Sequence, residues 1–271
     1  MAIRPAPAVT TITTITIMIT ATTTGTITGT AITTTMDTDR PQAERAADGL
    51  LKLAAWTSPS FPVGAFAYSH GLEWAVEAGL VRDAESLRAW AAHLLAQGAP
   101  RQDAVLLARA YRQLDEAAGL LETAELAAAL KGTAELAQET VVQGGAFLRT
   151  VRAAWPQPAL DALATRFARD KLELALPVAV GLCAATHGID LSATLRFFLH
   201  GAAANTVSAA IRLSMIGQTD GQRVTAALEP VILSVASQAL AADPDALWSA
   251  VPMVDWCSMR HETQHTRLFR S

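Results

Sequence analysis

The amino-acid sequence predicts an all-α protein: a single multi-helix bundle domain with a low-complexity N-terminal tail and a flexible C-terminal tail. Hydrophobic residues make up 51% of the chain and charged residues 17%. Much of the apolar content is alanine and leucine, which favour helices. From residue 44 onward, apolar side chains recur at helical spacing, and the segments end at glycines and prolines. Outside the N-terminal tail there is no alternating strand pattern and no solenoid repeat.

Residues 1–43 form the expected N-terminal tail. Between Thr10 and Thr35 the chain holds fifteen threonines, interleaved with isoleucine and glycine. Alternating Thr and Ile favours strands, but a lone strand would have no partner in a helical chain. The segment is also a poor signal peptide, because Arg4 is its only early charge and no leucine-rich core follows. We expect a disordered low-complexity tail, or a translation start at Met36 that leaves most of it out.

The helical domain is expected over residues 44–257. A loop with two prolines over residues 58–64 separates the first two helices, and Asp83 has the position of an N-cap. The firmest boundary is Trp155–Pro158, and Pro230 is expected to kink its helix. The expected helices cover residues 44–56, 65–79, 83–97, 100–114, 122–153, 159–187, 190–215 and 220–242.

Charge, hydropathy and cysteine content exclude several classes of protein. The net charge is −4 without a basic stripe, so nucleic-acid binding is not expected. We find no segment of clean transmembrane length; the apolar run over residues 172–185 contains Glu173 and Pro177 and indicates a buried helix. Cys183 and Cys257 lie far apart, each among apolar residues, which predicts two buried thiols.

One motif indicates catalysis. Residues 261–265 read His-Glu-x-x-His, which on a helix places two zinc ligands on one face and a general base between them. His261, Glu262 and His265 would then form a zinc peptidase site, but only six residues follow His265 and the helical chain offers no substrate-binding strand. No nucleophile elbow or phosphate-binding loop is present. We therefore predict no enzyme and no catalytic, cofactor-binding or metal-binding residue. A generic helical scaffold stays open as a further alternative.

Two segments are dense in aromatic and polar residues. They cover residues 61–74 and 259–271 and combine Phe, Tyr, Trp and Arg, the residue types that anchor protein interfaces. Together with residues 205–223, they resemble the three signatures of the urease accessory protein UreF family. The resemblance covers about residues 48–271 and has its three motifs in the family's order.

The resemblance implies an all-α, cytoplasmic homodimer. Such a dimer would bind an accessory protein of the UreD/UreH type and the GTPase UreG, and would act on apo-urease. It would regulate GTP-dependent nickel insertion, with nickel handled by the complex and not held tightly by this chain. Residues 258–271 would be a partner-binding tail. Because an adaptor needs a segment that orders on binding, we expect residues 255–271 to be mobile in the free chain.

The resemblance also carries over individual residues. Glu73 matches a family glutamate implicated in gating the GTPase. Phe66 falls where some members have tyrosine, so its implied contact with Arg267 would be cation–π or apolar packing. His265 also stands where tyrosine is common, which makes the zinc motif a coincidence of that substitution. The expected protein-binding residues are Phe66, Tyr68, Glu73, Arg212, Gln218, Arg260, Glu262, Arg267 and Phe269.

Overall fold

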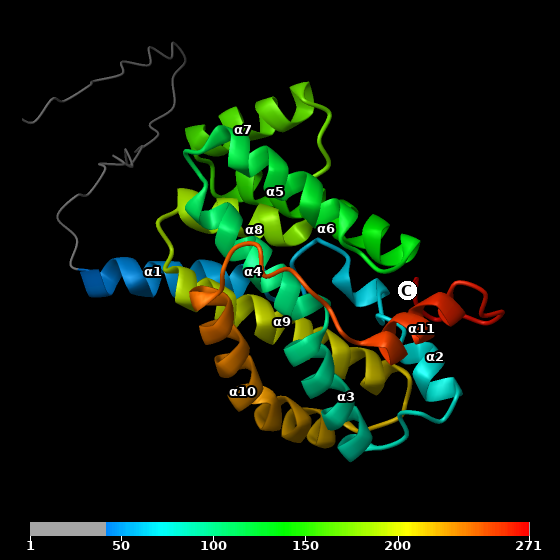
Figure 1. Cartoon of the computed structure of the whole chain (residues 1–271). Helices are drawn as coiled ribbons and strands as arrows, with labels where there is room; N and C mark the ends of the chain where they lie inside the picture. The colour runs from blue at the N-terminus through cyan, green and yellow to red at the C-terminus, as the bar shows by residue number, and fades with distance from the viewer. Residues whose placement is uncertain (1–41, 271) are drawn as a thin grey trace, which may run out of the picture. The chain divides into compact units, whose positions relative to one another are not determined.

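The computed structural model describes residues 42–270, which form a single helical domain without strands in that range (Figure 1). The all-α prediction is therefore confirmed, whereas the N-terminal tail lies almost wholly outside the described residues. The helices are α1 (Gln42–Trp56), α2 (Leu72–Glu77), α3 (Ala84–Gln97), α4 (Ala99–Arg112), α5 (Ala117–Ala129), α6 (Ala134–Ala154), α7 (Pro158–Arg169), α8 (Leu176–Thr186), α9 (Leu191–Arg212), α10 (Gln218–Ala241) and α11 (Pro252–His261), with a 3-10 turn, η1, over Ala65–Ala67.

Helix α8 lies at the centre of the core. Its residues 177–184 are all buried, and it contacts α4, α5, α6, α7 and α9. A helix that is apolar on every side is stable only when neighbours cover every side. Gly181 allows α4 to come close, since a Cβ there would lie 2.5 Å from the Leu107 carbonyl oxygen. The prediction of a buried helix is confirmed, although α8 begins only at Leu176.

The helix expected over residues 65–79 is reduced to η1 and α2, which residues 68–71 separate. Two further expected helices are each divided in two. Residues 122–153 contain a break at 130–133, where the Thr133 hydroxyl caps α6 by accepting the Leu136 N–H at 3.3 Å. Residues 159–187 contain a break at 170–175, and Pro177 then stands in the first turn of α8, where a missing N–H costs no helical bond. Sequence periodicity missed both breaks because apolar residues continue through them. The predicted cap at Asp83 is confirmed, since its carboxylate accepts the Ser86 N–H at 2.8 Å.

Helix α10 differs from the sequence expectation. Among the described residues it is long and apolar enough to cross a membrane, although the sequence had suggested no such segment. From Val224 to the end of the helix, Glu229 is the only charged residue. The helix packs on α9, α3 and α4, and Val224, Leu228 and Val235 are buried there, as in the core helix of a helical domain.

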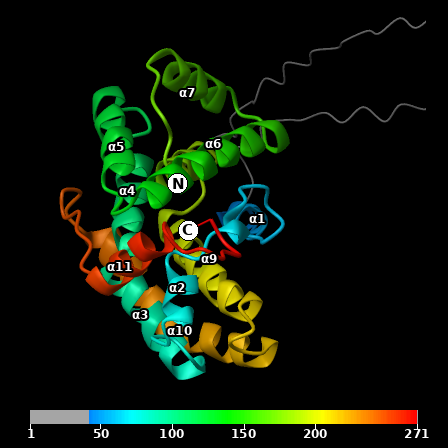
Figure 2. The ribbon, with the colours of Figure 1, turned by 90° about the vertical axis from the view of Figure 1, so that its right-hand side faces the viewer.

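An extended segment over residues 242–251 runs from α10 to α11 and is held by arginines of α4. The Arg101 guanidinium lies 3.8 Å from the centre of the Trp248 ring, and Arg109 forms an ion pair with Asp245 at 3.0 Å. This segment brings α11 beside α2, as Figure 2 shows. Cys257 on α11 is buried, which confirms its prediction, and burial raises the pKa of its thiol to about 11.

Adjacent glycines in α6 should respond oppositely to the same substitution. A Cβ at Gly144 would lie 1.9 Å from the Leu174 carbonyl oxygen, whereas a Cβ at Gly145 would meet only the end of the Arg149 side chain at 3.3 Å. We expect Gly144→Ala to lower the free energy of unfolding by about 1–3 kcal/mol. Gly145→Ala should leave it unchanged or raise it by up to about 1 kcal/mol. Urea unfolding followed by circular dichroism checks both; equal effects would contradict the close α6–Leu174 approach.

Candidate functional site

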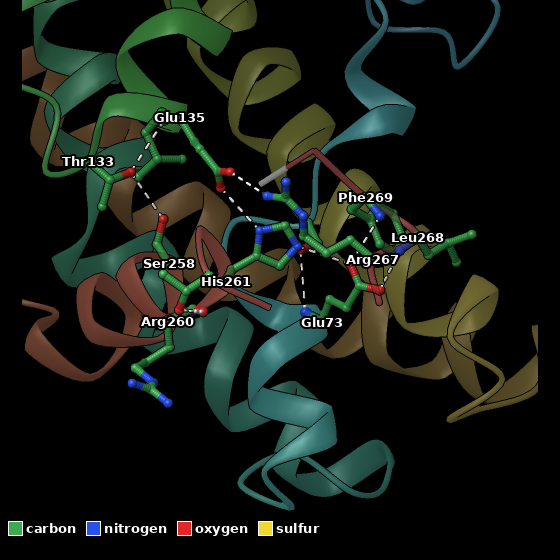
Figure 3. Close-up of polar contacts among 12 residues, drawn as sticks. Glu73, Thr133, Glu135, Ser258, Arg260, His261, Arg267, Leu268 and Phe269 are labelled. Carbon is green, nitrogen blue, oxygen red and sulfur yellow. Dashed lines mark hydrogen bonds and ion pairs between the residues drawn. The ribbon is translucent and has the colours of Figure 1, made fainter. Parts of the chain in front are cut away.

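The candidate site lies where α11 and the residues after it contact α2 and the start of α6. We call residues 262–270 the C-terminal segment. The close-up in Figure 3 shows side chains from α2, α6, α11 and this segment converging on the His261 ring. These elements are distant in sequence, so the fold alone brings their side chains together.

His261, the last residue of α11, is fully buried between two carboxylates. Its Nε2 lies 3.0 Å from Oε2 of Glu73 on α2. Its Nδ1 lies 3.1 Å from Oε2 of Glu135 in the first turn of α6. Both ring nitrogens are therefore engaged, and the imidazole links three helices.

Glu73 is a buried carboxylate that holds the main chain of the C-terminal segment. Its Oε1 accepts the Leu268 N–H at 2.6 Å, and its Oε2 accepts the Phe269 N–H at 3.0 Å. With His261, the carboxylate therefore receives three hydrogen bonds, which offset the cost of burying its charge. The Glu73 N–H donates to the Ser69 hydroxyl at 3.3 Å, which helps to fix the start of α2.

Further contacts hold the C-terminal segment on both sides of Glu73. The Arg267 guanidinium donates to Oε1 of Glu135 at 2.8 Å. Phe269 is buried, and the Arg212 guanidinium lies 4.2 Å from the centre of its ring. The Arg270 N–H donates to the Ala67 carbonyl at 2.7 Å. The segment thus connects η1, α6 and α9.

The approach of α11 to α2 requires a glycine. Gly71 has a φ of 76°, and a Cβ there would lie 2.7 Å from the Ser258 nitrogen, so a side chain would be strained and would collide with α11. The Ser258 and Thr133 hydroxyls lie 3.1 Å apart, which joins α11 to the N-cap of α6. On the outer side, Trp74 of α2 packs edge-on against Trp256 of α11.

A second histidine–glutamate pair lies beside the first. His70 contacts Oε1 of Glu139 at 2.9 Å, one turn along α6 from Glu135, and Gln143 donates to the same carboxylate oxygen at 2.8 Å. Burial lowers the pKa of His70, but the Glu139 carboxylate outweighs this effect, so that the pKa lies above its ordinary value. The loop before α2 is thereby tied to α6.

The structure brings together some of the sequence-predicted residues and separates others. Glu73, Arg267, Phe269 and Arg212 meet at the site as described above. Tyr68 is buried beside it, and its carbonyl accepts from the Asn205 amide at 3.1 Å. The remaining predicted residues are exposed: Gln218, Arg260, Glu262 and Phe66. The hydrogen-bond partners of the His261 ring are Glu73 and Glu135 instead.

Among the described residues, Phe66 and Arg267 form no cation–π pair. Phe66 is 64% exposed on η1, and Arg267 is drawn instead to the Glu135 carboxylate. The cation–π contact of the segment is made by Arg212 with Phe269. Sequence reasoning missed Glu135 altogether, because it precedes His261 by 126 residues and stands in an ordinary first-turn position for a glutamate.

The C-terminal segment, which the sequence predicts to be a flexible tail, contacts the helical core. Its main chain donates three hydrogen bonds to the helical core and its Phe269 side chain is buried. The acceptors are the Glu73 carboxylate and the Ala67 carbonyl.

The zinc-peptidase geometry is absent from the described residues. Helix α11 ends at His261, so His265 does not follow one turn later on the same helix, and it is exposed. Both nitrogens of His261 face carboxylates. No group of three or more His, Cys, Asp or Glu residues within 42–270 is arranged to hold a metal ion.

The fold and the site define a helical protein whose C-terminal segment docks on its own core. Comparison with known proteins identifies its family. The family model UreF matches residues 81–229. The chain is 50% identical to the urease accessory protein UreF of Rhodopseudomonas palustris strain HaA2 over 236 residues, covering 86% of this chain and 98% of that protein. It is 52% identical to UreF of Xanthobacter autotrophicus strain Py2 over 224 residues, covering 82% and 91%. The chain belongs to the urease accessory protein UreF family.

Glu73→Gln should release the C-terminal segment although it changes the side-chain volume very little. An amide has one acceptor oxygen and would turn its N–H₂ group towards the N–H groups of Leu268 or Phe269 or towards His261. We expect amide exchange at residues 268 and 269 to accelerate by at least about tenfold, since a hydrogen bond to a charged group contributes roughly 1.5–3 kcal/mol.

The matched control is Glu77→Gln, on the same helix one turn later, where the carboxylate contacts only the Gln264 side chain among the contacts we identify. Exchange at residues 268 and 269 should stay close to wild type in this variant. Hydrogen–deuterium exchange with mass spectrometry provides the measurement. Equal protection in both variants would show that Glu73 does not hold the segment.

Proposed function

We propose that this urease accessory protein is an adaptor that binds a UreD/UreH-type protein and the GTPase UreG. In this role it regulates GTP-dependent insertion of nickel into apo-urease. Nickel is the cargo of the assembly, and this chain contributes binding surfaces instead of a tight metal site. The cytoplasmic location that the family suggests is part of the same proposal.

One observation supports this proposal above the others. The two segments with the composition of interface residues, 61–74 and 259–271, are joined in space through Glu73 and the main chain of the C-terminal segment. A partner that contacts the C-terminal segment therefore contacts a structure that α2 holds in place. Contact at one segment can then change the position of the other, as coupling between two partners requires.

The outward side of α11 and the C-terminal segment has the character of an interface. Met253, Trp256 and Met259 are exposed on α11, and Leu268 is 62% exposed on the segment. The Arg260 guanidinium lies 5.9 Å from the centre of the Trp74 ring. Exposed Met, Trp and Arg side chains are typical of surfaces that bind another protein.

The homodimer belongs to the same proposal. Residues 231–242, at the end of α10, carry no charged side chain. On the outer side of that stretch Leu233, Ser234 and Ser237 are exposed. An uncharged surface can face a second copy of itself without like-charge repulsion, as a two-fold interface requires.

Co-purification tests the adaptor role. A chain that ends at Thr266 lacks the donors of Leu268 and Phe269 and the Arg267 guanidinium, but keeps α11 and His261. We expect the full chain to retain both the UreD/UreH-type protein and UreG, and the shortened chain to lose the first and, with it, the second. Affinity purification of the mixed proteins, followed by light scattering, measures this.

Val142→Ala is the control, because Val142 is an exposed apolar residue on α6 outside both segments. This variant should bind as the wild type does. Undiminished binding by the shortened chain would remove the C-terminal segment from the interface. Failure of the full chain to bind either protein would contradict the adaptor role itself.

Leu233→Arg should convert the dimer to a monomer. A charge on the apolar outer side of α10 would be buried without a partner in a two-fold interface. Sedimentation velocity measures the mass, with Val142→Arg as the control for adding an arginine at another exposed apolar position. A wild-type monomer, or a dimer that survives Leu233→Arg, would place the interface elsewhere or exclude it.

A further inference from the structure

We propose that His261 is a positioning residue that carries a proton on both ring nitrogens and holds the C-terminal segment in place through Glu73 and Glu135. The ring makes none of the hydrogen bonds to the segment itself. It fixes the two carboxylates that accept them. The inference concerns the isolated chain and does not depend on the proposed partners.

The hydrogen-bond geometry leads to this protonation. Nε2 lies 3.0 Å from a Glu73 oxygen and Nδ1 lies 3.1 Å from a Glu135 oxygen. Ionised carboxylates accept hydrogen bonds and cannot donate, so each ring nitrogen must donate. Two N–H donors are the pattern of the imidazolium form, whereas neutral imidazole has one donor and one acceptor.

The charges of the surrounding groups agree with this form. The groups that face the ring or its partners are the Glu73 carboxylate from α2, the Glu135 carboxylate from α6 and the Arg267 guanidinium from the C-terminal segment. With imidazolium, two negative and two positive charges balance in this cluster. With neutral imidazole, one of the two carboxylate charges would have no positive counter-charge. An uncompensated charge beside a fully buried ring is costly.

Each carboxylate divides its oxygens between the ring and the segment. Glu135 presents Oε2 to His261 and Oε1 to Arg267. Glu73 presents Oε2 to His261 and to the Phe269 N–H, which leaves Oε1 for the Leu268 N–H. The ring thus sets the rotation of both carboxylates, and the segment docks on the oxygens that this rotation exposes.

The ring can be examined directly in the wild-type protein. Nuclear magnetic resonance of full-length protein labelled with ¹⁵N-histidine distinguishes the two forms, because each protonated nitrogen shows a one-bond coupling to its hydrogen. We expect both nitrogens of one slowly exchanging, buried histidine to be protonated in the folded protein. Assignment by loss of the signal in His261→Gln identifies the residue. A single protonated nitrogen at His261 would overturn the proposal.

A variant tests the effect on the segment. In His261→Gln, we expect amide exchange at residues 268 and 269 to accelerate by at least about tenfold. The glutamine amide has one N–H₂ group and one acceptor oxygen, so it cannot take the place of two ring donors that point to two different carboxylates. His265→Gln is the control: His265 is exposed on the same segment and should leave exchange unchanged. Wild-type protection in a folded His261→Gln protein would overturn the proposal. If that variant does not fold, the ring measurement in the wild-type protein decides alone, with the signal assigned through its coupling to backbone resonances.

Discussion

The buried carboxylate of Glu73 holds the candidate site of this protein together. The Glu73 carboxylate is removed from solvent at the start of a six-residue helix, where it is satisfied by the His261 ring and by two main-chain N–H groups of the C-terminal segment. A buried carboxylate without such donors would be strongly destabilising. The surrounding elements therefore have to deliver donors to it, and three helices and the end of the chain meet there.

The helical core makes that meeting possible through close backbone contacts. Gly71 lets α11 approach α2, and Gly181 lets α4 approach α8. Thr133 caps α6 and meets Ser258 of α11, so that one hydroxyl both begins a helix and joins two elements. The position of Glu135 relative to His261 follows from these contacts, because both residues stand within one turn of a helix end that is held in place.

Much of the fold could be predicted from local patterns, since helical periodicity, the Asp83 cap and the proline-containing loops are properties of neighbouring residues. The breaks within residues 122–153 and 159–187 escaped prediction, because apolar residues run through them and tertiary packing decides where those helices end. In the site, Glu73, Arg267 and Phe269 stood out through their composition and the family resemblance. Glu135 and the role of His261 did not, because they depend on contacts between residues far apart in the chain. The His-Glu-x-x-His pattern pointed to a metal, whereas the structure uses its first histidine to join two carboxylates.

The contacts of Glu73 with Leu268 and Phe269 separate the attachment of the C-terminal segment from the side chains that the segment exposes. Glu73 binds their backbone N–H groups, which every amino acid except proline possesses, so docking places little demand on the side chain at position 268. That side chain extends into solvent while its neighbour Phe269 is buried. The exposed side chain at position 268 can therefore be substituted while the segment stays attached to the core. A protein built in this way can acquire a new partner preference at its C-terminal end by substitution alone, while the helical domain that supports it stays the same.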